Sequence, residues 1–502
     1  MQKLGSLLVV GAVLLAVGCS SDSGSSSTDA PTATAGATTS ASAAETTAPV
    51  GSSGTNTTEA PATVQPSDPT AASAPGDGGA TINVPEDQPT IQAAVDAAAP
   101  GDLVLIQPGM YHEAVTVETE NLTIRGLDRN TTILDGHFDL DNGIRVVGAN
   151  GVAIENLTAR NFTKNGFFWT GVTGYRGSYL TAFRNGDYGI YAFLSYKGLL
   201  EHSYGGGSPD AGFYIGGCYP CDSVIDDVVS EYNGLGYSGT NSGGDLYIVN
   251  SIFRFNRAGV VPNSGSYELC YPERSTTIIG NVVYSNNQPD TPAIDVALLA
   301  MGNGILSAGG VGNDIERNLV YDHDKTGVGL VPYLEEDPND DQPSRESWGR
   351  PCADTVNDPV PDPATVPDAV LWDSHENVVK DNALENNRVA DIAVDSAGTD
   401  LASLGNSFCG NTFTTSAPLQ LEALAPCDGA KPTATDWTAG VLNVVSWLGE
   451  THPPSQDYTT SSPEPPAQKT MPDAATAPAR PATDVPAKID TAAIGVPSKP
   501  AS

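Results

Sequence analysis

A glycine returns along the middle of the chain at a nearly constant interval, and this period limits the possible folds more than any other feature. It stands at positions 143, 166, 189, 212, 236 and 259, then at 304 and 327, with steps of 23 or 24 residues within each series. The residue after each glycine is apolar or aromatic: Ile144, Phe167, Ile190, Phe213, Tyr237, Val260, Ile305 and Val328. A further repeat has Asp391 in the glycine position, followed by Ile392. A fixed period with one inward-type position per repeat indicates a solenoid.

The residue types in these repeats favour strands over helices. Gly, Asn, Val, Ile and Tyr dominate, whereas a helical solenoid would need long helix-forming runs. A β-propeller is a formal alternative, but its blade takes about 40 residues, nearly twice this period. We therefore predict an all-β fold, a single-stranded right-handed parallel β-helix with about 23 residues per coil.

Asparagine recurs in the turn-forming half of the repeats. The positions are Asn156, Asn250, Asn281, Asn318 and Asn382. Amide side chains stacked at equivalent turns pair with one another, so we expect an asparagine ladder. A short helix should cap the N-terminal coil, with Asp87 as its N-cap and Ile91, Ala94 and Val95 on its buried face.

Both ends of the chain differ in composition from the repeats. Lys3, an apolar run over residues 4–17 and the pair Gly18-Cys19 resemble a bacterial lipoprotein signal peptide over residues 1–19, in which the cysteine becomes the acylated N-terminus. Ordinary secretion with an unrelated Cys19 is the alternative. Residues 20–80 are predicted to form a disordered stalk and residues 431–502 a mostly disordered tail, because both are rich in Ser, Thr, Ala and Pro. We expect the β-helix domain over residues 81–430, on a protein exported and lipid-anchored to the outer face of the bacterial cell membrane.

The net charge of the chain limits the kinds of molecule that it is expected to bind. Its 23 Lys+Arg and 60 Asp+Glu residues give a formal net charge of -37. Such a surface repels phosphate backbones, so nucleic acid is not expected as a partner. An acidic polysaccharide is not excluded, because bound cations could bridge it to the protein, and calcium is the cofactor that this chemistry leaves open. The sequence does not indicate the oligomeric state.

Six cysteines follow Cys19. They are Cys218, Cys221, Cys270, Cys352, Cys409 and Cys427. An even number in an exported chain favours disulfides, and six cysteines allow 15 pairings. Proximity suggests Cys218–Cys221 and Cys409–Cys427, which leaves Cys270 with Cys352. A redox or zinc role for the Cys218–Cys221 motif is the alternative, but no second CxxC motif and no βαβ context accompany it.

Insertions interrupt the repeats near residues 263–275, 288–301 and 335–372. Insertions in a solenoid map to loops on one side, which is often the binding side. The alternative is that they carry no function, because solenoid turns tolerate insertions at a small entropic cost.

Four segments near the start of the domain carry a resemblance to known families. They are residues 90–95 (TIQAAV), 101–104 (GDLV), 108–113 (PGMYHE) and 122–126 (LTIRG). They resemble the opening coils of pectin-methylesterase-like and copper-maturation-type β-helix proteins. The later coils look like the parallel β-helix repeats shared by pectate lyases, polygalacturonases and mannuronan epimerases. The resemblance implies the pectate-lyase-like fold but not an activity, because this scaffold hosts enzymes and non-enzymes.

The catalytic motifs of these families do not carry over. Asp226-Asp227 is present, but the Gly-His-Gly of polygalacturonases is not. The Gln-Asp-Thr segment of pectin methylesterases and the Arg-x-Pro-x-x-Arg run of pectate lyases do not occur either. Asp322-His323-Asp324 resembles the epimerase Asp-Pro-His-Asp, without its proline.

The repeat register nevertheless predicts a surface. The residue two after each glycine should point outward, and this column contains Phe168, Tyr191 and Tyr214 on successive coils about 4.8 Å apart. Two residues before each glycine stand Lys164, Asp187, Asp210 and, two coils later, Arg257. His202 lies one coil before the Asp210 turn and could face the same groove.

We interpret Phe168, Tyr191, Tyr214, Lys164, Arg257 and His202 as a polysaccharide-binding face, with Asp187 and Asp210 as candidate catalytic acids. Three functions fit: a surface protein that binds a polysaccharide, a lyase, epimerase or hydrolase of acidic glycans, and a structural surface protein without ligand. Outward aromatics that only stabilise the stack, and solvated turn aspartates, are the structural alternative. The remaining histidines have no recognisable zinc-ligand spacing.

Overall fold

The computed structural model describes residues 79–336, 352, 369–483 and 489–500. The signal peptide with Cys19, almost the whole stalk and most of the insertion at 335–372 therefore lie outside the described residues. Where the structure is described, no helix is long and apolar enough to cross a membrane.

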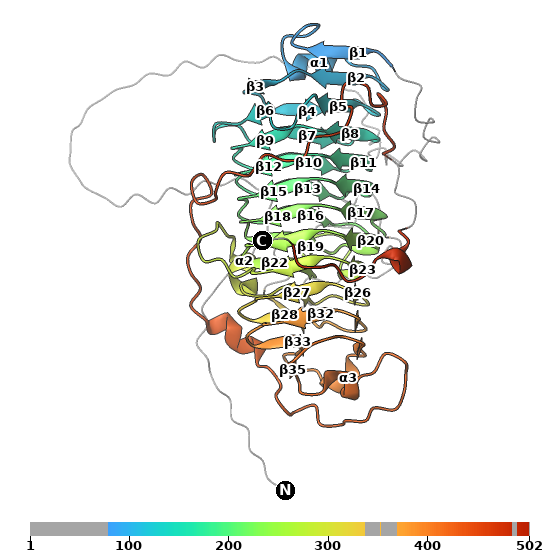
Figure 1. Ribbon diagram of the computed structural model, residues 1–502, viewed down its shortest axis with the longest axis vertical. Coiled ribbons are helices and arrows are strands. Elements are labelled where there is room, and N and C mark those ends of the chain that lie inside the picture. The colour runs from blue at the N-terminus through green and yellow to red at the C-terminus, as the bar shows by residue number, and fades with distance from the viewer. Residues whose placement is uncertain (1–78, 337–351, 353–368, 484–488, 501–502) are drawn as a thin grey trace, which may run out of the picture. The chain divides into compact units, whose positions relative to one another are not determined.

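The chain folds as a single-stranded right-handed parallel β-helix with three parallel sheets, as the repeat predicted (Figure 1). Sheet A contains β1 (Thr81–Val84), β2 (Leu103–Ile106), β5 (Thr123–Gly126), β8 (Val152–Glu155), β11 (Thr173–Ser178), β14 (Tyr196–Glu201), β17 (Ser223–Asp226), β20 (Gly243–Val249), β23 (Arg274–Ile279), β26 (Asp314–Glu316), β31 (Val378–Lys380) and β34 (Ser407–Cys409). Sheet B contains β3 (Gly109–Tyr111), β6 (Thr132–Asp135), β9 (Thr158–Arg160), β12 (Thr181–Phe183), β15 (Tyr204–Gly206), β18 (Val229–Glu231), β21 (Ile252–Arg254), β24 (Val282–Tyr284), β27 (Leu319–Tyr321) and β32 (Ala383–Glu385). Sheet C contains β4 (Val115–Val117), β7 (Ile144–Val147), β10 (Phe167–Thr170), β13 (Ile190–Phe193), β16 (Ala211–Gly216), β19 (Leu235–Thr240), β22 (Ala258–Asn263), β25 (Ile305–Ala308), β28 (Thr326–Val331), β33 (Ala390–Val394) and β35 (Ser416–Ala417).

The remaining elements are short. Among the described residues they are the antiparallel hairpin of β29 (Tyr333–Glu336) and β30 (Ala369–Trp372), the helices α1 (Ile91–Ala97), α2 (Asp295–Ala300) and α3 (Leu421–Leu424), and the short 3-10 helices η2 (Leu401–Ser403), η3 (Val444–Gly449) and η4 (Thr491–Ala493). Helix α1 caps the first coil, but its N-cap is Thr90, whose side chain accepts a bond from Ala93. The expected cap, Asp87, instead accepts hydrogen bonds from the main chain and side chain of Asn83.

The periodic glycines stand where successive coils approach most closely. A Cβ atom on Gly143 would lie 2.4 Å from the carbonyl oxygen of Gly166, and one on Gly259 would lie 2.3 Å from that of Gly304. Real Cβ contacts are not this short, so only glycine fits. The residue after each glycine then points into the core, where Ile144, Phe167, Ile190, Phe213, Tyr237, Val260, Ile305, Val328 and Ile392 are all fully buried.

Asparagine side chains stack at all three corners of the coil, including Asn377 on Asn406 between sheets C and A. Between sheets A and B, Asn281, Asn318 and Asn382 form consecutive rungs, with amide nitrogen to amide oxygen distances of 3.0 Å. Glu422 of α3 accepts the last bond of this ladder, from Asn411. Asn156 and Asn250 are not rungs, because they occupy the preceding left-handed position, with φ of 57° and 51°. The sequence pattern had merged these two neighbouring columns.

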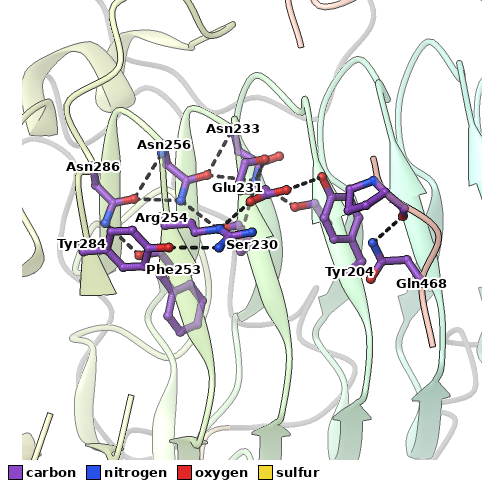
Figure 2. Close-up of polar contacts among 12 residues, drawn as sticks. Tyr204, Ser230, Glu231, Asn233, Phe253, Arg254, Asn256, Tyr284, Asn286 and Gln468 are labelled. Atoms are coloured by element: carbon purple, nitrogen blue, oxygen red, sulfur yellow. Dashed lines mark hydrogen bonds and ion pairs between the residues drawn. The ribbon is translucent and has the colours of Figure 1, made fainter. Parts of the chain in front are cut away.

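A second ladder, between sheets B and C, contains Asn233, Asn256 and Asn286 (Figure 2). His323 forms the next rung: its Nδ1 donates to Asn387 Oδ1 at 2.8 Å, and its Nε2 accepts from the Asn286 amide at 3.2 Å. This pattern requires a neutral ring. Burial lowers the pKa of His323 to about 4. His323 therefore has a structural role in the ladder, which accounts for the Asp322-His323-Asp324 triplet.

The tail differs from its expected disorder. Residues 453–462 lie at the corner between sheets B and C and against the α2 insertion, and the later described residues of the tail lie against sheets A and B. Hydrogen bonds hold the tail over much of its described length. Figure 1 shows the tail rising from the level of β28 to that of β5. The composition predicted disorder because the tail has few apolar residues of its own. The hydrogen-bond donors that hold it, such as Arg125 and Arg257, belong to the β-helix and leave no signal in the tail's own composition.

The described residues contain three disulfides, and their pairing is the one that proximity suggested. They are Cys218–Cys221, Cys270–Cys352 and Cys409–Cys427. The insertions at 263–275 and 335–372 both leave the coil between sheets C and A, and the second disulfide joins them. The insertion at 288–301 leaves between sheets B and C and forms α2.

The His323 rung makes a pH prediction. From pH 6.5 down to about 4, the unfolded chain binds a proton at this histidine that the folded chain does not. The free energy of unfolding should therefore fall as the pH is lowered through this window, by about 3 kcal/mol. His323→Asn keeps the rung and removes the titrating group. Urea unfolding at pH 7, 5 and 4 should show a weaker loss in the variant, and equal pH dependence in both proteins would contradict this assignment.

Candidate functional site

The outward column of sheet C lies in register across successive coils. Phe168 pairs with Arg145 on one side and with Tyr191 on the other, and Tyr191 pairs with Tyr214. The strands that carry them, β7, β10, β13 and β16, follow one another in the sheet (Figure 1). Strand alternation thus brings these side chains to one face, since their neighbours in each strand point into the core.

Phe168, Tyr191 and Phe193 form what we call the aromatic strip. The rings of Phe168 and Tyr191 are stacked with centroids 4.6 Å apart, and Phe193 stacks on Tyr191 at 5.8 Å. The exposed Arg145 guanidinium lies 5.6 Å from the Phe168 ring centroid. All three rings are half-buried, so part of each meets solvent. Phe193 was missed by the sequence argument, although it lies two residues beyond Tyr191 on the same face.

Tyr214 does not extend the exposed strip, as the sequence argument expected. It is fully buried, its ring packs edge-on against Tyr191 at 4.8 Å, and its hydroxyl donates to Glu268 at 2.5 Å. Glu268 belongs to the insertion at 263–275. The 23-residue period could not predict that Glu268 covers Tyr214, because the insertion that carries Glu268 lies outside the repeat register.

Three carboxyl groups meet at the edge of the strip, and we call Asp187, Asp210 and Glu268 the carboxyl cluster. Asp210 donates its main-chain N–H to the Asp187 carbonyl at 3.2 Å, which confirms that the two aspartates occupy equivalent turns. Asp187 is half-buried, whereas Asp210 and Glu268 are buried.

Burial is the main cause of the raised pKa values in the carboxyl cluster. It raises the pKa of Asp187 to about 6, against the opposing effect of Lys164, and that of Glu268 to about 8, against the Tyr214 hydrogen bond. The pKa of Asp210 lies well above its usual range, through burial and then the charge of Asp187. Near pH 7 the cluster therefore holds both protonated and ionised carboxyl groups.

Tyr188 connects the carboxyl cluster to the strip. Its hydroxyl hydrogen-bonds to Asp210, and its ring stacks on Tyr191 at 4.3 Å with an interplanar angle of 5°. Sequence reasoning missed this residue, although it stands between Asp187 and the periodic Gly189 and so belongs to the same turn.

Of the three other expected site residues, one lies at the carboxyl cluster and two lie elsewhere. Lys164 is exposed beside Asp187, as expected from its column. Arg257 is fully buried and donates to carbonyls of the α2 insertion and the tail, so it does not flank the carboxyl cluster. His202 lies at the corner between sheets A and B, where its Nδ1 is 2.7 Å from Asp227 Oδ2, and not in the same groove. The period placed both residues in the right coil but could not tell which corner each side chain faces.

Within the described residues, no group of three or more His, Cys, Asp or Glu side chains is arranged to hold a metal ion. The calcium that the acidic sequence left open therefore has no assigned ligands here.

Known structures with parallel β-helix domains are similar to this chain. The A-module of a mannuronan C-5 epimerase from Azotobacter vinelandii is 15% identical, with a TM-score of 0.40 over 64% of this chain and 90% of that one. An alginate lyase from Paenibacillus is 13% identical, with a TM-score of 0.34 over 66% and 95%. A pectin methylesterase from Erwinia chrysanthemi is 11% identical, with a TM-score of 0.30 over 74% and 100%. No protein-family model and no curated protein matches the chain. At these identities and scores, the likeness carries no activity over to this chain.

Proposed function

We propose that this protein is an exported, lipid-anchored β-helix protein that binds a polysaccharide along the aromatic strip of sheet C. The observation that carries the proposal is the half-exposed stack of Phe168 and Tyr191 with Arg145 at its end. Aromatic rings that are partly open to solvent offer apolar contact to the pyranose rings of a sugar chain, and charged and polar groups at the rim fix the orientation of a ligand.

The shape of the strip suits a chain-like ligand. Its rings repeat at the spacing of the coils, about 4.8 Å, so a sugar chain could contact more than one of them. Lys164 and Arg145 offer cations to an anionic chain, while Asp187 can accept hydrogen bonds from hydroxyl groups. In the described tail, no hydrogen bond reaches β10 or β13, although residues 453–462 lie at the neighbouring corner between sheets B and C.

Ring removal tests the binding proposal. Tyr191→Ala and Phe168→Ala should each weaken binding about tenfold, because each removes aromatic surface that is open to solvent and could contact a sugar ring. Binding to a panel of cell-wall, plant and algal polysaccharides, measured by calorimetry on a polysaccharide that the unmodified protein binds, is the readout.

Tyr232→Ala is the matched control, since this half-buried ring is stacked on Phe255 at 5.6 Å at the corner between sheets B and C. Unchanged affinity in both strip variants would overturn the proposal. A protein that binds no member of the panel would favour the third function, a structural surface protein without ligand.

The support for a membrane anchor comes from the sequence that ends at Cys19. Small residues directly before this cysteine, with a polar Ser/Asp/Gly-rich segment after it, support acylation. Labelling of cells with a radioactive fatty acid should mark the protein, and Cys19→Ala should abolish the label and release the protein from the membrane fraction. A membrane-bound, labelled Cys19→Ala protein would refute the anchor.

A second candidate function is the cleavage or epimerisation of an acidic glycan. The carboxyl cluster favours it, because carboxyl groups with pKa values of about 6 and about 8 can supply a base and an acid at neutral pH. Asp187 is the member open to solvent and would act as the base, with Tyr188 and Asp210 behind it.

Asp187→Asn separates this function from binding alone. If Asp187 is the base, release of unsaturated or shortened oligosaccharides should fall about 100-fold or more. In the unmodified protein, the rate should rise as the pH rises through about 6, when the carboxyl loses its proton. Asp141→Asn is the control, since Asp141 is exposed in the same column two coils away. Full activity in Asp187→Asn would exclude this site.

A further inference from the structure

Five arginine side chains of the β-helix donate hydrogen bonds to main-chain carbonyl groups of the tail. Arg257 reaches Pro453 and Pro454 at 2.6 and 2.7 Å, Arg184 reaches Ser462, Arg129 reaches Lys469 at 3.2 Å, Arg125 reaches Ala474, Ala477 and Pro478 at 3.3, 3.1 and 2.7 Å, and Arg317 reaches Thr491 at 2.8 Å. We call these five arginines the arginine track.

The arginine track joins coils that do not touch each other. Arg257 belongs to the coil of β20 to β22, and Arg125 lies on β5. In sheet A, the strands β8, β11, β14 and β17 separate β5 from β20. The tail spans this distance along the side of the domain (Figure 1). In a solenoid each coil otherwise contacts only its neighbours, so the tail supplies long-range contacts that the repeat cannot.

The side chains of the arginine track depend on these contacts. Arg257 is fully buried and Arg129 is 2% exposed. Among the described residues, the oxygen atoms they bond are carbonyls and the hydroxyl of Thr181, not carboxylates. A buried cation is costly unless its donors are satisfied. The tail carbonyls are therefore part of what makes the burial of Arg129 and Arg257 tolerable.

The arginine track bonds the main chain of the tail, while tail side chains such as Ser455, Thr470 and Arg480 make further hydrogen bonds to the rest of the chain. Among its described residues from 453 onward, only Ser462 and Ala474 are buried, and none pairs in a sheet. Frequent proline holds such a chain extended and reduces the entropy lost when it is ordered. Contacts through carbonyl groups need few particular side chains, which explains how a low-complexity sequence can dock at defined positions.

We propose that the arginine track is a docking site for an extended, proline-rich polypeptide main chain, and that its occupant is this chain's own C-terminal tail. The docked tail fastens non-adjacent coils. It makes the coils between β5 and β27 open together, whereas a solenoid without such a fastener frays from its ends.

Full-length Arg184→Gln/Arg257→Gln tests both parts of the proposal. Loss of two anchors should free residues 453–464, so a protease of broad specificity should cut the tail about tenfold faster. Hydrogen exchange in β5, β6 and β9 should also accelerate about tenfold, because the stretch of tail that links these coils to those of Arg184 and Arg257 is released, which leaves the bond of Arg317 to Thr491 as the remaining arginine link to later coils. Arg184→Gln alone tests docking if the double variant does not fold, since Arg184 is half-buried and bonds only tail residues through its described hydrogen bonds.

Arg254→Gln is the matched control. Arg254 is also half-buried on the outer surface, but it bonds Glu231 and Tyr284 and not the tail (Figure 2). Tail cleavage no faster than in the unmodified protein would overturn docking, and so would equal acceleration by Arg254→Gln, which would indicate general loosening. Faster cleavage with unchanged exchange in β5, β6 and β9 would overturn fastening.

Discussion

The structure depends on how closely one coil can lie on the next. The glycine column permits this approach, because a Cβ at Gly143 or Gly259 would collide with a carbonyl oxygen of the adjacent coil. Parallel main-chain hydrogen bonds then form in all three sheets, and the apolar residue after each glycine is carried into the core. The amide ladders at the corners satisfy polar groups that would otherwise be buried without partners.

The same stacking creates the candidate site. Residues at equivalent positions of neighbouring coils become neighbours in space, so two aromatic rings one period apart form a stacked pair, and two aspartates one period apart become electrostatically linked. The insertion that carries Glu268 then covers one end of the outward column. This cover buries Tyr214, adds a third carboxyl group and helps to keep water from Asp210, which raises its pKa. The repeat places the aromatic rings and the aspartates side by side, and the insertion buries Tyr214 and adds Glu268 to them.

The tail shows how low-complexity sequence can be ordered by its partner. Its own side chains bury little surface, and on composition alone it belongs to the disordered class. The β-helix provides the donors, as at Arg125 and Arg257, and the tail provides carbonyl groups that every residue carries. Order of this kind leaves no signal in the hydrophobicity of the ordered segment. Its only trace in the sequence is a set of arginines scattered over the repeats.

The sequence by itself determined the fold, the strand register of sheet C and the residues that share its outer face, because each depends on a local period of about one coil. The core positions and the pairing of Asp187 with Asp210 could be read for the same reason. Only the tertiary structure decided what covers each face: the burial of Tyr214 under Glu268, the link through Tyr188, the removal of Arg257 from the site and the course of the tail. These contacts join segments far apart in the chain, and no periodic pattern encodes them.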